Sequence, residues 1–148
     1  MRKLKLIVFS ILICSALGSL AYAQSTTKQS MTVERIIDGD TFVASGVKIR
    51  LWGIDAPEKD HPVSYAAALY LETLLGEGNL SCEFVDIDRY ERSVMKCFVD
   101  NNDIARSLVR FGMATDYKRY SKGYYDFEEN IAKKNHSGLW KYEGSKKI

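Results

Sequence analysis

The chain has 148 residues, of which 21 are Lys or Arg and 19 are Asp or Glu, and its formal net charge is +2. This length is enough for one compact domain with a single hydrophobic core, and not for two. The near-neutral balance excludes a protein that binds polyanions through its overall charge, so any such binding must come from a local patch.

Residues 1–23 have the features of a secretory signal peptide. A basic start precedes an apolar run from Leu6 to Leu20, and the small-x-small sequence Ala21-Tyr22-Ala23 follows. The apolar run is too short to predict a membrane span. We therefore expect cleavage after Ala23 and export to the periplasm or the medium, without stable membrane insertion afterwards. The mature chain would carry 18 basic and 19 acidic residues, a net charge of −1, because three basic and no acidic residues precede the cleavage point.

The rest of the chain divides into three predicted parts. Residues 24–31 are mostly polar and are expected to form a flexible tether. Residues 32–142 are expected to form the folded domain, and residues 143–148 a short tail. We expect this domain to be a monomer.

Strand and helix patterns follow one another in a simple order within the folded domain. Runs rich in β-branched and aromatic residues predict strands near residues 32–37, 40–45, 47–54, 80–87 and 93–99. Helical patterns fall near residues 64–75, 103–111 and 123–135. Most strands precede most helices, which predicts an α+β fold, a barrel with helices packed to one side.

The end of the first predicted strand begins a cluster of charged residues. Asp38-Gly39 is a turn dipeptide, so Asp40 is expected at the start of the next strand. A hairpin around Ser45-Gly46 would return the chain so that Asp55 emerges beside Asp40. One cation would then contact both aspartates.

A short proline-containing segment follows this hairpin. Pro57 fixes its own backbone and restricts Ala56 to an extended conformation. The Asp55 side chain, the Ala56 carbonyl and the Glu58 side chain are therefore expected along one defined curve. Taken alone, Asp-Gly is usually a structural turn and Asp-Ala-Pro-Glu a solvated loop at a helix start, so these motifs carry weight only in combination.

Arg50 lies in the middle of an apolar strand, where the hairpin should place it near Thr41. A buried guanidinium is costly without an anionic partner, and either the carboxylate cluster or a substrate phosphate would supply one. Carboxylates suit a hard cation such as Ca²⁺, and guanidinium groups suit phosphate. The combination indicates a site that cuts phosphodiester bonds.

Five motifs occur in a defined order along the chain. They are Ile-Asp-Gly-Asp-Thr at 37–41, Arg-Leu-Trp-Gly-Ile-Asp-Ala-Pro-Glu at 50–58, Asp-Arg-Tyr-Glu-Arg at 88–92, Ser-Leu-Val-Arg-Phe-Gly-Met-Ala at 107–114 and Gly-Leu-Trp at 138–140. Together they resemble the staphylococcal-nuclease-like (thermonuclease) family over residues 32–141. The resemblance implies a five-stranded OB-type β-barrel with three packed helices, and a Ca²⁺-dependent phosphodiesterase that acts on DNA and RNA.

The resemblance also assigns a role to each charged residue by position. Asp40 and Asp55 match side-chain metal ligands and the Ala56 carbonyl matches a backbone ligand, so the implied cofactor is Ca²⁺. Glu58 matches the carboxylate that orients or deprotonates the attacking water.

Two arginines and two further polar residues complete the implied site. Arg50 and Arg92 match the pair that binds the scissile phosphate and stabilises charge in the transition state. Asp38 and Thr41 are expected beside the metal ligands instead of on the metal.

Tyrosines are expected to contact the nucleotide. The family places a tyrosine near it from two regions, matched here by Tyr90 and by Tyr117 or Tyr120. Residues 117–125 interleave aromatic rings with cations, which suits unpaired bases and their phosphates. The alternative for this segment is a solvated loop leading into a helix. Because a stacked base must be unpaired, single-stranded or fraying DNA and RNA are the expected substrates.

The residue before Arg92 departs from the family pattern, which often has glycine there. The turn is expected to require a positive φ, and Glu91 would have to adopt it. Glu91 would also be able to pair with Arg92 and compete with phosphate.

Two cysteines, Cys82 and Cys97, are nearly equidistant from the turn around Arg89-Tyr90. If the strand register places them directly opposite at a non-hydrogen-bonded pair, their Cα atoms lie about 4.5 Å apart, within reach of a disulfide. An exported chain meets an oxidising compartment. A disulfide and two buried thiols are the alternatives.

Three classes of function fit the sequence. An exported Ca²⁺-dependent nuclease is favoured because the charged positions of the implied site are all present, namely Asp40, Arg50, Asp55, Glu58 and Arg92. The second class is a non-catalytic OB-fold module of the cell envelope that binds nucleic acid or a protein. The third is an envelope structural or inhibitor domain.

Overall fold

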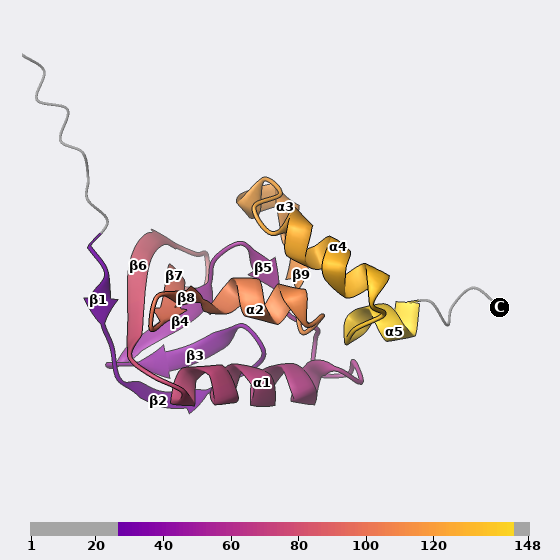
Figure 1. Cartoon of the computed structure of the whole chain (residues 1–148). Helices are drawn as coiled ribbons and strands as arrows, with labels where there is room; N and C mark the ends of the chain where they lie inside the picture. The colour runs from indigo at the N-terminus through magenta and orange to yellow at the C-terminus, as the bar shows by residue number, and fades with distance from the viewer. Residues whose placement is uncertain (1–26, 144–148) are drawn as a thin grey trace, which may run out of the picture.

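The computed structural model describes residues 27–143. The predicted signal peptide, the start of the predicted tether and residues 144–148 of the predicted tail lie outside this range. The described chain forms a curled sheet with helices packed against it, and the C-terminal helices lie farthest from the first strand (Figure 1). This arrangement confirms the α+β class.

The main sheet has the strand order β1-β6-β7-β4-β3-β2, and β8 pairs with β7. Neighbours are antiparallel except β4 and β7, which are parallel. A separate antiparallel pair joins β5 to β9. The bounds are β1 Gln29–Ser30, β2 Val33–Ile36, β3 Thr41–Ala44, β4 Val47–Leu51, β5 Ile54–Asp55, β6 Leu80–Ile87, β7 Ser93–Val99, β8 Asn102–Asp103 and β9 Thr115–Asp116. The five predicted strands are β2, β3, β4, β6 and β7, and their curled sheet agrees with the OB-type fold.

Within residues 27–143, three helices correspond to the predicted ones and two short helices are additional. The bounds are α1 Ser64–Gly76, α2 Ile104–Arg110, α3 Lys118–Ser121, α4 Asp126–Lys134 and α5 Leu139–Glu143. The pattern at 123–135 is α4, which begins later than predicted. The two additional helices span four and five residues, too short to show a helical period.

Local backbone chemistry sets where these helices begin and end. Lys122 and Gly123 adopt left-handed φ values of 57° and 85°, which end α3 and delay the start of α4. Asp103 caps α2, because its carboxylate accepts a hydrogen bond from the Arg106 N–H at 3.1 Å.

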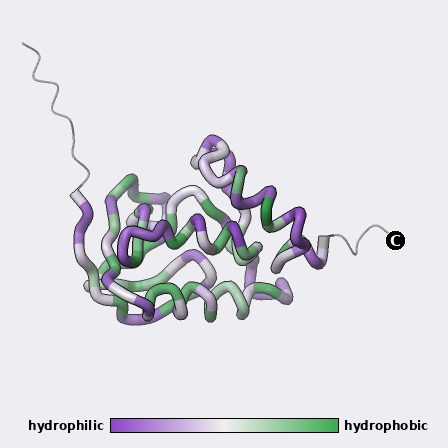
Figure 2. The backbone as a smooth tube through the Cα atoms, viewed as in Figure 1, coloured by the Kyte–Doolittle hydropathy of each residue, from purple (hydrophilic) through white to green (hydrophobic). Residues whose placement is uncertain are grey.

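The hydrophobic core lies between one face of the sheet and helices α1 and α2. Phe42 and Ile49 face inward from β3 and β4 and are fully buried, as are Leu71 of α1 and Leu108 of α2. Figure 2 shows apolar segments along these elements, whereas α4 alternates between polar and apolar segments. Because side chains alternate along a strand, the polar residues of β3 and β4 lie on the opposite face.

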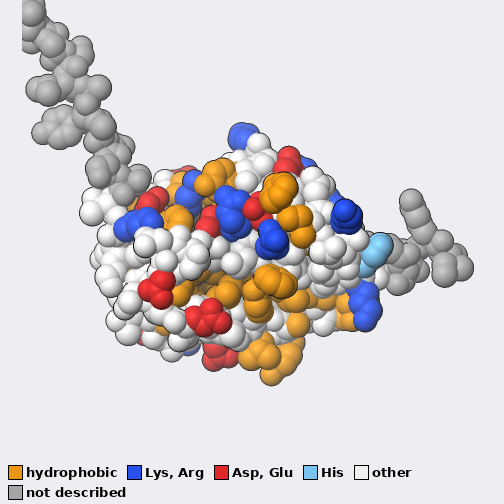
Figure 3. All heavy atoms as spheres, in the orientation of Figure 1, with side chains coloured by type: hydrophobic (Ala, Val, Ile, Leu, Met, Phe, Trp, Pro, Cys, Tyr) orange, Lys and Arg blue, Asp and Glu red, His pale blue; other side chains and the backbone are white. Residues whose placement is uncertain are grey.

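The visible surface mixes side chains of different kinds. Figure 3 shows basic, acidic and hydrophobic groups interspersed on one face of the molecule, so no single sign of charge covers it. Between residues 27 and 143, no helix combines the length and the apolar character that a membrane crossing requires.

The last part of the predicted tether belongs to the folded domain. Gln29 and Ser30 pair with the edge of β6, and the Met31 N–H donates to the Leu80 carbonyl at 3.0 Å. The Met31 side chain is 8% exposed and joins the core. The prediction of a flexible tether was therefore wrong for residues 29–31, because an apolar side chain and a free strand edge hold this segment in place.

A disulfide joins Cys82 of β6 to Cys97 of β7. The two residues are directly opposite in the strand register, with their Cα atoms 4.1 Å apart. Both side chains are buried. The bond therefore links the two strands that lead to and from the turn carrying Arg92.

We expect the mature protein to contain no free thiols, because the third cysteine, Cys14, precedes the predicted cleavage site. Reduction should lower the free energy of unfolding by about 3 kcal/mol, the chain-entropy value for a loop of this size. Thiol titration of denatured protein purified without reductant, and urea unfolding with and without reductant, measure the two effects. Two titratable thiols would contradict the bond.

Candidate active site

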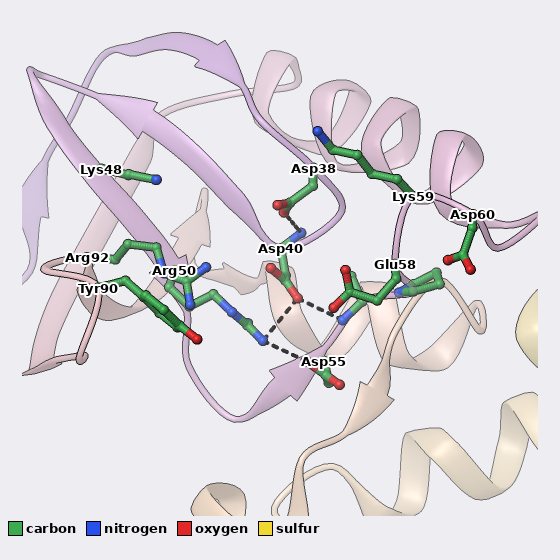
Figure 4. Close-up of a pocket in the computed structure, with 12 residues that line it drawn as sticks. Asp38, Asp40, Lys48, Arg50, Asp55, Glu58, Lys59, Asp60, Tyr90 and Arg92 are labelled. Carbon is green, nitrogen blue, oxygen red and sulfur yellow. Dashed lines mark hydrogen bonds and ion pairs between the residues drawn. The ribbon is translucent and has the colours of Figure 1, made fainter.

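An open cleft of about 670 Å³ lies beside β4, the segment after β5 and the β6–β7 turn. Its lining is strongly charged and consists of Asp38, Asp40, Lys48, Arg50, Asp55, Ala56, Pro57, Glu58, Lys59, Asp60, Tyr90 and Arg92. Figure 4 shows Lys48, Arg92 and Tyr90 on one side and most carboxylates on the other, with Arg50 reaching between them. The fold thus brings all the predicted metal ligands and catalytic residues into one cleft.

Asp40 lies directly before β3, where its neighbours hold its carboxylate in place. Its own N–H donates to Asp38 Oδ1 at 3.1 Å, as expected of an Asp-Gly turn. Its Oδ1 atom accepts from the Thr41 hydroxyl at 3.0 Å, and Oδ2 accepts from the Ala56 N–H at 2.7 Å. Asp38 and Thr41 therefore support Asp40 directly, and the Ala56 loop is tied to the same carboxylate.

Gly39 allows this turn to approach helix α1 closely. A Cβ atom at residue 39 would lie 2.7 Å from the Cβ of Ala67 in α1 and 2.9 Å from the Cβ of Ala56. Both distances are well below the optimal separation of carbon atoms that are not bonded. A side chain here would therefore displace the turn, the helix or the Ala56 loop.

Arg50 of β4 bridges the two predicted metal-ligand carboxylates. Its Nη2 atom lies 3.0 Å from Asp40 Oδ2 and 3.0 Å from Asp55 Oδ1, and its Nη1 donates to the Leu51 carbonyl at 2.9 Å. It also lies opposite Thr41 in the β3–β4 register, as predicted. The anionic partner that a buried arginine requires is therefore the carboxylate pair.

The Asp40 carboxylate is strongly affected by its surroundings. Burial raises the pKa of Asp40 to about 6, although the charge of Arg50 and the Ala56 N–H act in the opposite direction. The residue is only 6% exposed, whereas the Asp55 side chain is 60% exposed. The ionised form of Asp40 therefore depends on a nearby positive charge, and Arg50 provides it.

The two carboxylates are arranged so that one positive group contacts both, as the Nη2 atom of Arg50 does. Their hard oxygens match the donors that Ca²⁺ prefers, and Ala56, whose carbonyl is the predicted backbone ligand, also lines the cleft. Among the described residues, no group of three or more His, Cys, Asp or Glu side chains is placed to hold a metal ion. The residues fit a site that supplies few protein ligands and leaves the others to water and substrate.

Glu58 enters the cleft from the loop that follows Pro57. The His61 N–H donates to the Glu58 carbonyl at 2.9 Å, which forms a turn that holds the loop before α1. The Glu58 carboxylate points toward Asp40 in Figure 4. This position leaves a carboxylate beside the predicted metal ligands.

Arg92 is oriented by Asp88 and Thr41. Its Nε lies 2.6 Å from Asp88 Oδ2, and its Nη1 donates to Thr41 Oγ1 at 3.2 Å. Burial raises the pKa of Asp88, but hydrogen bonds from Arg92 and Tyr90 outweigh it, so that the pKa lies below its usual value. Glu91 adopts the expected positive φ, 62°, and the carboxylate paired with Arg92 is that of Asp88.

The predicted tyrosines divide between two places. Tyr90 lines the cleft and is 63% exposed, with the guanidinium of Arg92 5.5 Å from its ring centre. Tyr117 and Tyr120 contact each other with ring centres 5.1 Å apart, but they are not part of the cleft lining. Of these three tyrosines, Tyr90 is the one that lines the cleft.

The cations near Tyr117 and Tyr120 are partly engaged by local groups. Lys118 forms ion pairs with Asp126 and Glu129 of α4, and the Lys122 ammonium donates to the Arg119 carbonyl at 2.8 Å. These contacts favour a structural role for the segment, the alternative that the sequence left open.

Sequence reasoning gave no role to several residues that belong to this site. Asp88 opens the Asp-Arg-Tyr-Glu-Arg motif, and its separation of four residues from Arg92 was the available signal. Lys48 is two residues before Arg50 on the same strand, so alternation places both on one face. Lys59 and Asp60 extend the Glu58 loop along the cleft.

The sequence of the protein was compared with known families. Residues 48–142, more than half of the chain, match the family model described as "Staphylococcal nuclease homologue". The chain belongs to this family. The matched region of this staphylococcal nuclease homologue includes Arg50, Asp55, Glu58 and Arg92, whereas Asp40 precedes it.

Individual relatives include proteins from bacteria and a yeast. The "Succinoglycan biosynthesis protein ExoI" of Rhizobium meliloti is 34% identical over 118 residues, which cover 72% of this chain and 62% of the relative. An "Uncharacterized endonuclease" of Haemophilus influenzae is 33% identical, covering 80% of this chain and 70% of the relative. The "Probable endonuclease LCL3" of Komagataella phaffii is 30% identical, covering 66% and 50% respectively. The chain therefore spans between half and about two thirds of these longer relatives.

Arg50→Ala should lower the free energy of unfolding by about 2–4 kcal/mol, because it leaves the buried Asp40 carboxylate without its cation. Adding Asp40→Asn should restore part of this loss, since the uncompensated charge is then absent. Urea unfolding at neutral pH of the two single variants and the double variant measures both effects. Lys48→Ala, an exposed change on the same strand, is the control and should stay within about 0.5 kcal/mol of the parent. Equal effects of Arg50→Ala and Lys48→Ala would contradict the bridge.

Proposed function

We propose that this protein is an exported, Ca²⁺-dependent nuclease that hydrolyses phosphodiester bonds of DNA and RNA. The observation that carries the proposal is the Arg50 bridge between Asp40 and Asp55, with Glu58 and Arg92 in the same cleft. Family membership and relatives named as endonucleases support a nuclease. The metal and the substrates are proposals from the site residues and from the family resemblance, and the export is a proposal from residues 1–23.

The metal would be held by Asp40, Asp55 and the Ala56 carbonyl. Bound Ca²⁺ would supply positive charge next to the scissile phosphate and lower the pKa of a nearby water. The Ala56 N–H and the Thr41 hydroxyl hold the Asp40 carboxylate in a fixed orientation.

The remaining residues have separate roles in hydrolysis. Glu58 accepts the proton of the attacking water, since its carboxylate lies beside Asp40 in the cleft. Arg92 donates hydrogen bonds to the phosphate oxygens, and the Asp88 carboxylate orients the Arg92 guanidinium for this contact. Arg50 has the same role once its contacts with the two carboxylates are shared with the phosphate.

The substrate form and the cell compartment are proposed on separate observations. The exposed ring of Tyr90 favours a stacked, unpaired base, which supports single-stranded or fraying substrates. The buried disulfide suits an oxidising compartment, which supports a periplasmic or secreted protein together with the signal-like residues 1–23. We propose that the mature protein acts as a monomer. The alternative, a non-catalytic OB-fold module, predicts binding of nucleic acid without cleavage.

Ca²⁺ should be required for cleavage, because Asp40 and Asp55 provide acidic oxygens suited to it. The direct assay is digestion of supercoiled plasmid DNA, and separately of single-stranded RNA, in Ca²⁺ and in EDTA. Asp40→Asn should abolish cleavage while the protein remains folded by circular dichroism. Full activity of the parent in EDTA would contradict the metal proposal, and intact substrate under all conditions would favour the binding module.

Arg92→Ala should reduce turnover by about two to three orders of magnitude, the usual cost of losing a donor to transition-state charge. Asp88→Asn keeps the size of the side chain but loses its charge, so it should give a smaller loss in turnover. Steady-state rates on one oligonucleotide measure both variants. Asp86→Asn on the neighbouring strand is the matched control. Near-normal turnover of Arg92→Ala would contradict its role at the phosphate.

A further inference from the structure

The outer face of strands β2, β3 and β4 carries a row of residues that starts at the cleft. Val43 of β3 is directly opposite Arg35 of β2 on one side and Lys48 of β4 on the other. Residues directly opposite in an antiparallel pair point to the same face of the sheet. Arg35, Val43 and Lys48 therefore share a face, the one opposite to the core residues Phe42 and Ile49.

This row adjoins the two arginines of the site. Lys48 and Arg50 are two residues apart on β4 and share a face, about 6.6 Å apart along the strand. On the other side, Ile49 is opposite Ser93 in the parallel β4–β7 pair, which places Lys48 next to Arg92. Figure 4 shows the Lys48 ammonium directed into the cleft above Arg92. The positive groups thus continue from Arg92 and Arg50 through Lys48 toward Arg35.

Arg35 and Lys48 are available to an external anion. Both are exposed, and the ion pairs found within residues 27–143 do not involve either of them. Two strand spacings separate them, about 9.6 Å. Lys118 is different, because two carboxylates of α4 already pair with it.

The opposite side of the cleft is less favourable for a polyanion. It carries four carboxylates, Asp38, Asp40, Glu58 and Asp60, against one cation, Lys59, so its net charge repels phosphates. A nucleic-acid strand that leaves the scissile position should therefore run over β4 toward β2. The spacing of Lys48 from Arg50 is on the scale of neighbouring phosphates in an extended single strand.

We propose that Lys48 and Arg35 form a phosphate-binding track for the strand that flanks the scissile phosphate. Lys48 binds the phosphate next to the cleaved one, and Arg35 binds one farther along the same strand. The track rests on the proposed function, because the cleft must hold a phosphodiester for its neighbours to reach these residues. The track would make the protein bind polymeric, extended substrates more tightly than short nucleotides.

The salt dependence of binding tests the track independently of cleavage. A fluorescent single-stranded oligonucleotide of eight residues is titrated with protein in EDTA over a range of NaCl concentrations, and anisotropy gives Kd. Arg35→Ala/Lys48→Ala should weaken binding about tenfold at low salt. It should also reduce the slope of log Kd against log salt by about 1.4, since each phosphate contact on a single strand contributes about 0.7.

A matched control removes the same charges elsewhere. Arg110→Ala/Lys134→Ala also deletes one exposed arginine and one exposed lysine, and it should leave the slope unchanged. An unchanged slope in Arg35→Ala/Lys48→Ala would overturn the track. So would a loss of slope in Arg119→Ala/Lys122→Ala that equals or exceeds that of the track variant, because the strand would then follow α3.

Uncharged analogues of the phosphate show which linkage of the substrate contacts Lys48. A methylphosphonate at the linkage next to the cleaved one, on one side only, should raise KM of the parent several-fold and have little further effect in Lys48→Ala. Equal effects in both proteins would overturn the assignment of Lys48. A parent that binds the oligonucleotide but never cleaves it in Ca²⁺ would refute the proposed nuclease function, and the salt slopes would still decide the track.

Discussion

The ion-pair bridge of Arg50 with Asp40 and Asp55 is the interaction on which the rest of the site depends. It connects a turn, a strand and a loop that are separate in sequence, and it compensates a carboxylate that burial would otherwise neutralise. The same carboxylate holds the Ala56 N–H, so the loop that leads to Glu58 is fixed by the same charge. A phosphate or a metal ion entering the cleft therefore competes for groups that already stabilise the fold, which couples binding to local stability.

Much of this site was predictable because the decisive constraints are local. An arginine within an apolar strand requires an anionic partner to offset the cost of burial, and the hairpin around Ser45-Gly46 limits where that partner can lie. The register that places Arg50 opposite Thr41 followed from the hairpin alone. The partner of Arg92 was harder to predict, because Glu91 is adjacent in sequence. The positive φ of Glu91 takes the chain through a tight turn in which Asp88 is the carboxylate that contacts Arg92.

The predictions that failed depend on distant contacts. Met31 joins the core only because the edge of β6 is free to pair with Gln29 and Ser30. Distant contacts also bear on the aromatic and basic segment after β9, where nucleic-acid binding and a solvated loop were the alternatives. Helix α4 brings acidic side chains to Lys118, and the sequence of the segment does not contain that information. Two-residue strands such as β5 and β9 likewise arise from tertiary pairing and have no periodic signal.

Three residues with little or no side chain meet where the acidic turn, the Ala56 loop and helix α1 converge. The contacts at Gly39, Ala56 and Ala67 leave no free volume, so the relative positions of the Asp40 and Ala56 donors are set by backbone packing against a helix. Adding one methyl group at this junction would displace the packed backbone, and the donor atoms would move by a similar distance. For the proposed metal site, changing the ionic radius that is accepted would therefore begin at these small residues, away from the carboxylates of Asp40 and Asp55.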